Sequence, residues 1–162
     1  MEELCKVEMK KILAALDLSA YSENTFTHAL DLARRYGAEL VMFNVINDRG
    51  LEVLDRIQAE GYGVSRAEYV QKVQDERRQE FERDYLSRTG ETTVRLVFKV
   101  GLPYEQILKY IRQENIDMVV LGTKGRNALA HALFGTTADK VYRRAGCLVL
   151  SVRGPEHCVM LG

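Results

Sequence analysis

The sequence lacks several features that would point to other classes of protein. It has only two prolines in 162 residues and an ordinary hydrophobic content, which argues against a disordered chain. Its 23 lysines and arginines equal its 23 aspartates and glutamates, so no net charge draws it to nucleic acid or membranes. No apolar run reaches the length of a membrane span, and the charged first residues lack the apolar segment of a signal peptide. We therefore expect a cytoplasmic protein with neither a nucleic-acid nor a membrane partner.

Disulfide, metal and common nucleotide-binding motifs are also missing. The three cysteines, Cys5, Cys147 and Cys158, form no C-x-x-C pair and are odd in number, which suits a reducing compartment. The three histidines show no metal-ligand spacing, so no metal site is predicted. Neither G-x-x-x-x-G-K-[ST] nor G-x-G-x-x-G occurs, so the sequence does not indicate a P-loop NTPase or a dinucleotide enzyme.

What is present is a regular alternation of apolar runs and amphipathic helical segments. The predicted strands are residues 11–18, 39–46, 91–100, 117–121 and 147–152. The predicted helices end at Tyr36, cover 64–87, run from Pro103 to Asn115, and begin at Thr136, with a short helical turn at 51–58. This alternation predicts an α/β fold: an open, doubly wound five-stranded parallel sheet, in the expected order 3-2-1-4-5, with helices on both faces. We interpret residues 1–162 as one domain, with a variable loop and helix insertion at 47–90 and a polar tail at 153–162.

A glycine-punctuated segment, Gly122–Thr137, separates the fourth strand from the last helix. Glycines let backbone N–H groups approach a ligand, and the first turn of a helix presents unpaired N–H donors at the positive end of its dipole. Together they favour a phosphate site. The alternative is that the glycines are plain turn residues and that Thr136 to Asp139 form a capping box. In the expected strand order, Asp17 and Gly122 end neighbouring strands and share one crevice at the switch point.

These segments resemble the universal stress protein family over nearly the whole chain. The family's nucleotide signature, Gly-x2-Gly-x9-Gly-Ser/Thr, is filled by Gly122, Gly125, Gly135 and Thr136. The flanking segments agree in the same order along the chain: Asp17-Leu-Ser19, Asn44-Val-Ile46, Gly101-Leu-Pro103, Ile116-Asp117 and Ala138-Asp-Lys-Val141. The motif is that of the ATP-binding branch of the family.

The resemblance implies an ATP site, with Mg²⁺ accompanying the nucleotide. It places Asp17 near the ribose hydroxyls and Val45 against the adenine. The remaining implied contacts lie along the ribose and phosphates: Gly122, Gly125, Gly135, Thr136 and Thr137. Lys124, within the loop, is either a further phosphate contact or a solvated cation.

The function implied is an ATP-binding regulatory protein, a nucleotide-dependent conformational or partner switch in a stress response. One alternative is a slow ATPase or phosphate-transferring enzyme, for which the loops offer no evident water-orienting group apart from Asp17. Another is a carrier of a different adenosine-containing ligand. No catalytic residue is assigned. The family usually forms homodimers, often by pairing the last strands, and the apolar run 148–152 suits that contact. The alternative is that the chain's own tail covers this edge.

Overall fold

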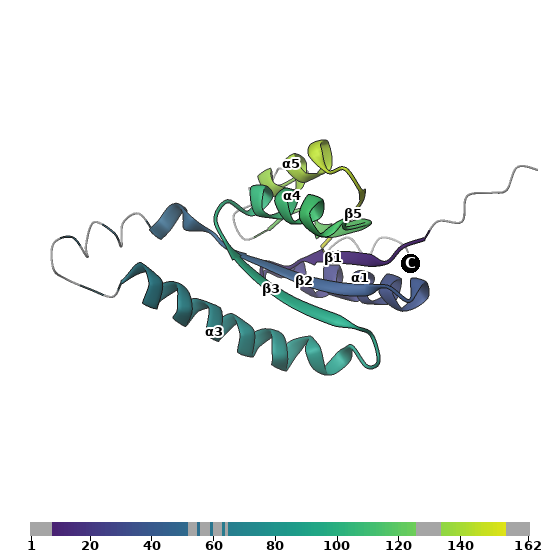
Figure 1. The fold of residues 1–162 in the computed structure, drawn as a ribbon, viewed down its shortest axis with the longest axis horizontal. Helices are drawn as coiled ribbons and strands as arrows, with labels where there is room; N and C mark the ends of the chain where they lie inside the picture. The colour runs from purple at the N-terminus through teal and green to yellow at the C-terminus, as the bar shows by residue number, and fades with distance from the viewer. Residues whose placement is uncertain are drawn as a thin grey trace, which may run out of the picture.

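Five parallel strands form one sheet in the order β3-β2-β1-β4-β5 in the computed structural model (Figure 1). The structure describes residues 8–51, 55, 59, 63, 65–125 and 134–154. The strands are β1 (Lys11–Ala15), β2 (Glu39–Ile46), β3 (Val94–Val100), β4 (Met118–Gly122) and β5 (Leu148–Val152). Strands β1, β2 and β4 are buried along most of their length, as strands covered on both faces must be. The predicted sheet and strand order are confirmed.

In the part of the chain that the structure describes, four longer helices connect or flank the strands. They are α1 (Ser22–Tyr36), α3 (Arg66–Asp84), α4 (Pro103–Glu114) and α5 (Thr136–Arg144), with short 3-10 turns η1 (Asp48–Gly50) and η2 (Leu86–Arg88). Gly37, at φ 64°, ends α1, and Pro103 stands in the first turn of α4, both as predicted. No helix among the described residues is long and apolar enough to cross a membrane.

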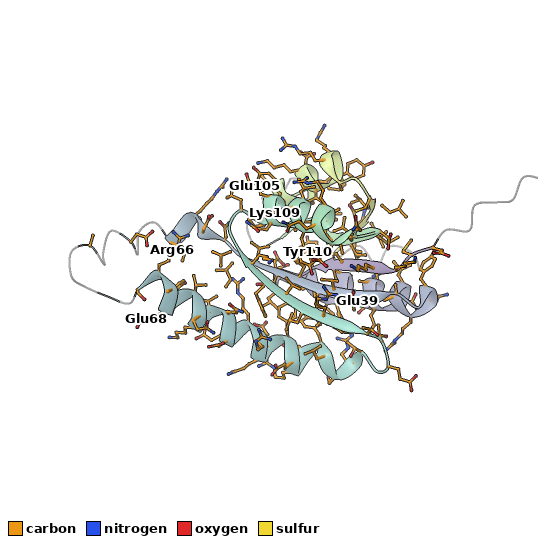
Figure 2. All side chains as sticks on the ribbon, in the orientation of Figure 1. Glu39, Arg66, Glu68, Glu105, Lys109 and Tyr110 are labelled. Atoms are coloured by element: carbon orange, nitrogen blue, oxygen red, sulfur yellow. The ribbon has the colours of Figure 1, made fainter. Side chains whose placement is uncertain are left out.

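Helices cover both faces of the sheet and form two separate cores. On one face Phe26 of α1 and Phe81 of α3 pack with Met42, and all three are fully buried. On the other face α4 and α5 contribute Ile111 and Val141, which pack with residues such as Phe43 of β2. Tyr110 of α4 lies over the sheet in this second layer (Figure 2). The predicted doubly wound arrangement is therefore confirmed.

Two predicted strands are too long because local turns interrupt them. Strand β1 ends at Ala15 rather than residue 18, since Leu18 adopts a left-handed conformation with φ 61°. Strand β3 begins at Val94 rather than residue 91, because the Thr92 N–H bonds back to the Thr89 carbonyl in a turn. Strands β4 and β5 begin one residue later than predicted, and β4 includes Gly122.

The charged helix α3 is shorter than the predicted 64–87. It begins after Ser65, whose hydroxyl accepts from the Glu68 N–H while the Glu68 carboxylate accepts from the Ser65 N–H, a complete capping box. Arg66 and Glu68 mark this end of the helix, which extends past the ends of the strands (Figure 2). The predicted helical turn at 51–58 and the tail beyond residue 154 lie largely outside the described residues.

Candidate functional site

The carboxyl ends of β1 and β4 lie side by side. The two strands pair in parallel up to Ala15 opposite Leu121, so β1 ends shortly before Asp17 and beside the last residues of β4, which ends at Gly122. Strand β1 connects through α1 to β2 on one side, and β4 connects through α5 to β5 on the other. This is the switch point of an open α/β sheet, where such folds bind ligands.

Asp17 is held in a fixed position by the turn that follows β1. Its Oδ1 accepts hydrogen bonds from the Ser19 N–H at 3.0 Å and from the Ser22 hydroxyl at 3.2 Å. The left-handed conformation of Leu18 accompanies this turn, at a cost of about 1–2 kcal/mol for a residue with a Cβ. The other carboxylate oxygen, Oδ2, faces the backbone of Gly125.

Two glycines of the loop are required by close contacts within the protein. A Cβ at Gly125 would lie 2.6 Å from Asp17 Oδ2. A Cβ at Gly122 would lie 2.9 Å from both the Lys124 carbonyl oxygen and Tyr21 Cβ. Neither glycine has a positive φ, so what demands glycine here is space and not backbone conformation.

The start of α5 lies against the same loop. The Gly135 N–H donates to the Thr123 carbonyl at 2.7 Å, which ties the two ends of the loop together. A Cβ at Gly135 would lie 3.5 Å from Lys124 Cα and 3.7 Å from the Gly125 nitrogen. Asp17, Gly125 and the first turn of α5 are therefore neighbours. Residues 126–133 lie outside the part of the chain that the structure describes.

The capping box considered as the alternative at Thr136 to Asp139 is not formed. Gly135 is the N-cap residue, no side chain caps the helix, and Thr136 stands exposed in the first turn. Asp139 instead forms an ion pair with Arg143 at 2.8 Å on the helix surface. The shift of one residue moves the threonine hydroxyls off the cap position, so Thr136 and the partly buried Thr137 lie beside the first-turn N–H groups.

The two remaining predicted residues lie on either side of this cluster. Lys124 is partly buried in the loop between Gly122 and Gly125. Val45 is partly buried near the end of β2, the strand next to β1, and its carbonyl accepts from Arg77 Nη1 at 3.1 Å. Sequence reasoning missed Arg77 as a site residue. Its signal was a charge within the apolar side of α3 marked by Val70, Val73 and Phe81.

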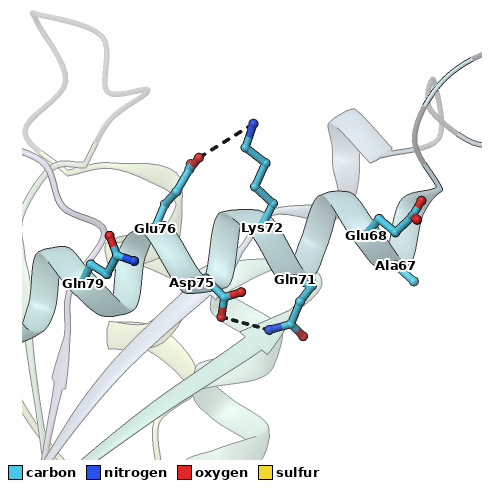
Figure 3. A pocket seen from close by; sticks show the side chains of 7 residues that line it. All are labelled: Ala67, Glu68, Gln71, Lys72, Asp75, Glu76 and Gln79. Atoms are coloured by element: carbon cyan, nitrogen blue, oxygen red, sulfur yellow. Dashed lines mark hydrogen bonds and ion pairs between the residues drawn. The ribbon is translucent and has the colours of Figure 1, made fainter.

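A hollow runs along α3, away from these strand ends. It is lined by residues of that helix alone: Ala67, Glu68, Gln71, Lys72, Asp75, Glu76 and Gln79 (Figure 3). Lys72 pairs with Glu76, and Gln71 with Asp75, along the helix surface. This is the solvated helix face that the alternating charges predict. Among the described residues, no three histidine, cysteine or acidic side chains form a group that could hold a metal ion.

The strand order and the position of the glycines define a single-sheet, doubly wound α/β protein with a glycine loop at its switch point. Residues 8–153 match the universal stress protein family. The chain is 31% identical over 150 residues to a putative universal stress protein of Staphylococcus haemolyticus, covering 91% of this chain and 86% of the relative. This chain therefore belongs to the universal stress protein family.

Two solved structures share the fold of this chain, and one of them is described as a universal stress protein. The universal stress protein UspA from Lactobacillus plantarum is 26% identical with a TM-score of 0.73, over 91% of this chain and all of that one. The hypothetical protein MJ0577 is 25% identical with a TM-score of 0.76, over 91% of this chain and 97% of that one.

Proposed function

We propose that this chain is a cytoplasmic, ATP-binding member of the family and acts as a regulatory protein whose conformation or partner choice follows the bound nucleotide. The observation that carries the proposal is the contact of Gly125 with Asp17, beside Gly135 and the first turn of α5. A carboxylate, a loop with glycines at its close approaches and a helix N-terminus meet at the switch point of the sheet. The carboxylate suits the ribose hydroxyls of a nucleotide, and the glycine loop and the helix N-terminus suit its phosphates.

The chemistry of the residues present fits ATP. The Asp17 carboxylate is an acceptor suited to ribose hydroxyls, and Val45 offers an apolar side chain and a backbone for the base. The first turn of α5 lacks a side-chain cap, so its backbone donors, with Thr136 and Thr137, suit phosphate oxygens. Lys124 lies in the loop between Gly122 and Gly125 and supplies a positive charge for the phosphates. Bound Mg²⁺ would neutralise part of the triphosphate charge.

Calorimetric titration of the purified protein, first stripped of any nucleotide it carries, tests the proposal. We expect Mg·ATP to bind at micromolar concentration or tighter, with ADP and AMP progressively weaker. Equal affinity for all three would mean that the glycine loop is not a phosphate site and would favour a carrier of another adenosine-containing ligand. Failure of all three to bind a folded protein would contradict the proposal.

The same samples distinguish a regulatory protein from an enzyme. Release of inorganic phosphate from Mg·ATP is measured across pH, with the Gly125→Val variant as the blank. Phosphate release at the blank's rate, together with tight binding, supports the switch. Turnover well above that rate which the valine abolishes would instead support the slow ATPase or phosphate-transferring alternative.

We further propose a homodimer formed through β5. This strand is an edge of the described sheet, and its first residue, Leu148, is 53% exposed. An apolar edge strand left open would pair with other chains indiscriminately. Light scattering should show a dimer for the wild type and a monomer for Leu148→Lys, with Leu32→Lys, on the partly buried side of α1, as a control for destabilisation. A wild-type monomer would contradict this proposal.

A further inference from the structure

Arg77 places a guanidinium among the side chains that face the sheet from α3. It follows Val73 by one turn and precedes the fully buried Phe81 by another. Its Nη1 donates to Asn44 Oδ1 at 2.7 Å and to the Val45 carbonyl at 3.1 Å. The charge of α3 thus reaches the carboxyl end of β2, at the residue proposed to contact the base.

Asn44 carries the contact on to β1. Its side chain is 1% exposed, and its Nδ2 donates to the Leu16 carbonyl at 2.6 Å. The backbone pairing of β1 with β2 runs to Ala15 and Phe43 and is continued by one bond from the Leu16 N–H to the Phe43 carbonyl. The Asn44 side chain supplies a further link past that point. A chain of hydrogen bonds therefore joins Arg77 to the residue that precedes Asp17.

This chain of bonds is costly to leave incomplete. A buried amide that loses its donor keeps an unsatisfied oxygen, and polar groups in a low-dielectric interior strengthen one another when all are paired. The helix does not depend on Arg77 alone for its attachment. The Phe81 ring lies 5.5 Å from Tyr85 and 5.8 Å from Phe98, so its C-terminal half is packed independently. Loss of Arg77 should therefore act locally, on the ends of β1 and β2.

We propose that Arg77 is a positioning residue for the nucleotide site: through Asn44 and the Val45 carbonyl it fixes the strand ends that hold the base and ribose. The inference rests on the proposed ATP site. Because binding and positioning are linked, a nucleotide that uses these strand ends also stabilises the attachment of α3 near Arg77. The stability of the attachment of α3 to the sheet would then depend on whether nucleotide is bound.

The test compares Arg77→Met, which keeps the aliphatic stem but removes the donors, with Arg77→Lys and with Arg83→Met. Arg83 lies on the same helix, exposed and paired with Asp84, so its variant is the matched control. Affinities for Mg·ATP and for AMP are measured by calorimetry. We expect Arg77→Met to weaken both ligands by the same factor, about tenfold, and Arg77→Lys to recover part of the loss. A defect of the phosphate loop would weaken ATP more than AMP.

Hydrogen exchange gives a second measurement. Binding of ATP should slow exchange of the α3 amides around residue 77 in the wild type and in Arg83→Met, and should leave them unchanged in Arg77→Met. If the wild type binds ATP and Arg77→Met binds both ligands as Arg83→Met does, the positioning role is wrong while the ATP site stands. If the folded wild type binds neither ligand, the ATP site itself is wrong, and the role of Arg77 falls with it.

Discussion

Asp17 and Gly125 lie in such close contact that a single methyl group at residue 125 would fall 2.6 Å from Asp17 Oδ2. The carboxylate has little freedom to retreat, because its other oxygen already accepts from the Ser19 N–H and the Ser22 hydroxyl. The two residues come from the turn after β1 and from the loop after β4, so their contact joins the ends of the two neighbouring strands. A change at residue 125 is therefore a change in the position of Asp17.

Gly125→Ala should weaken ATP binding by at least about tenfold, because the methyl group displaces the carboxylate proposed to hold the ribose. Gly146→Ala is the matched control, since a Cβ there meets nothing within 4 Å and its φ is not positive. Affinities are measured by calorimetry on variants whose folding is checked by circular dichroism. Unchanged affinity in folded Gly125→Ala would show that Asp17 does not contact the ligand.

Ser65→Ala and Thr136→Ala should have opposite effects on stability and binding. Ser65 completes a capping box, so its loss should destabilise the first turn of α3 by about 1 kcal/mol. Because Phe81 is the buried residue of that helix, the effect should be local and appear as faster hydrogen exchange near residues 67–70. Thr136 is no cap, so Thr136→Ala should change stability by less than about 0.5 kcal/mol.

For binding, Thr136→Ala should lower affinity for ATP about fivefold through the lost hydroxyl and leave AMP unaffected. Ser65→Ala should leave both affinities unchanged. A stability loss of about 1 kcal/mol in Thr136→Ala would instead indicate that the threonine caps α5 after all.

The sequence predicted those parts of the fold that depend on local pattern. Buried apolar runs identified β2 with its correct bounds, and the alternation of strands and helices led to the sheet order. Gly37 and Pro103 marked helix ends because their backbone preferences act locally.

Contacts between residues distant in the sequence could not be predicted from local pattern. The bond between Arg77 and Asn44 joins residues 33 positions apart, so the sequence showed only a charge out of place in an apolar stripe. Part of the need for glycine at 122 comes from Tyr21, the N-cap residue of α1, which is distant from the loop in the sequence. The left-handed Leu18 is a conformation that leucine seldom adopts, which is why the predicted β1 was too long.

Asn44→Leu should be strongly destabilising, because it leaves the Leu16 carbonyl and the Arg77 guanidinium without their amide partner. The buried Leu16 carbonyl left without a donor costs about 1–3 kcal/mol by itself. Asn47→Ala, at an exposed residue that accepts only the Arg49 N–H among the described contacts, serves as the control. The loss in the double variant with Arg77→Met should be smaller than the sum of the single losses, since both partners are then apolar. Urea denaturation measures the unfolding free energies of the two single variants, the double variant and the Asn47→Ala control. Strict additivity of the two single losses would show that Asn44 and Arg77 act independently.

Stability at high pH should depend on Tyr85. Burial, aided by the charges of Glu23 and Asp84, raises the pKa of Tyr85 to about 12, whereas a tyrosine in the unfolded chain titrates near 10. Between about pH 10 and 12 the folded state keeps a proton that the unfolded state has lost, so stability is full below that window and falls as pH rises through it.

Tyr85→Phe removes this ionisable hydroxyl, so the unfolding free energy should fall less steeply as pH rises through this window. The difference in unfolding free energy between Tyr85→Phe and wild type is measured by urea denaturation near pH 8 and again near pH 11. We expect it to shift in favour of the phenylalanine at the higher pH. Tyr142→Phe, at a ring that is 64% exposed, should show no such shift. If Tyr85→Phe and Tyr142→Phe follow the wild type equally at both pH values, the hydroxyl of Tyr85 ionises as readily in the folded protein as in the unfolded chain.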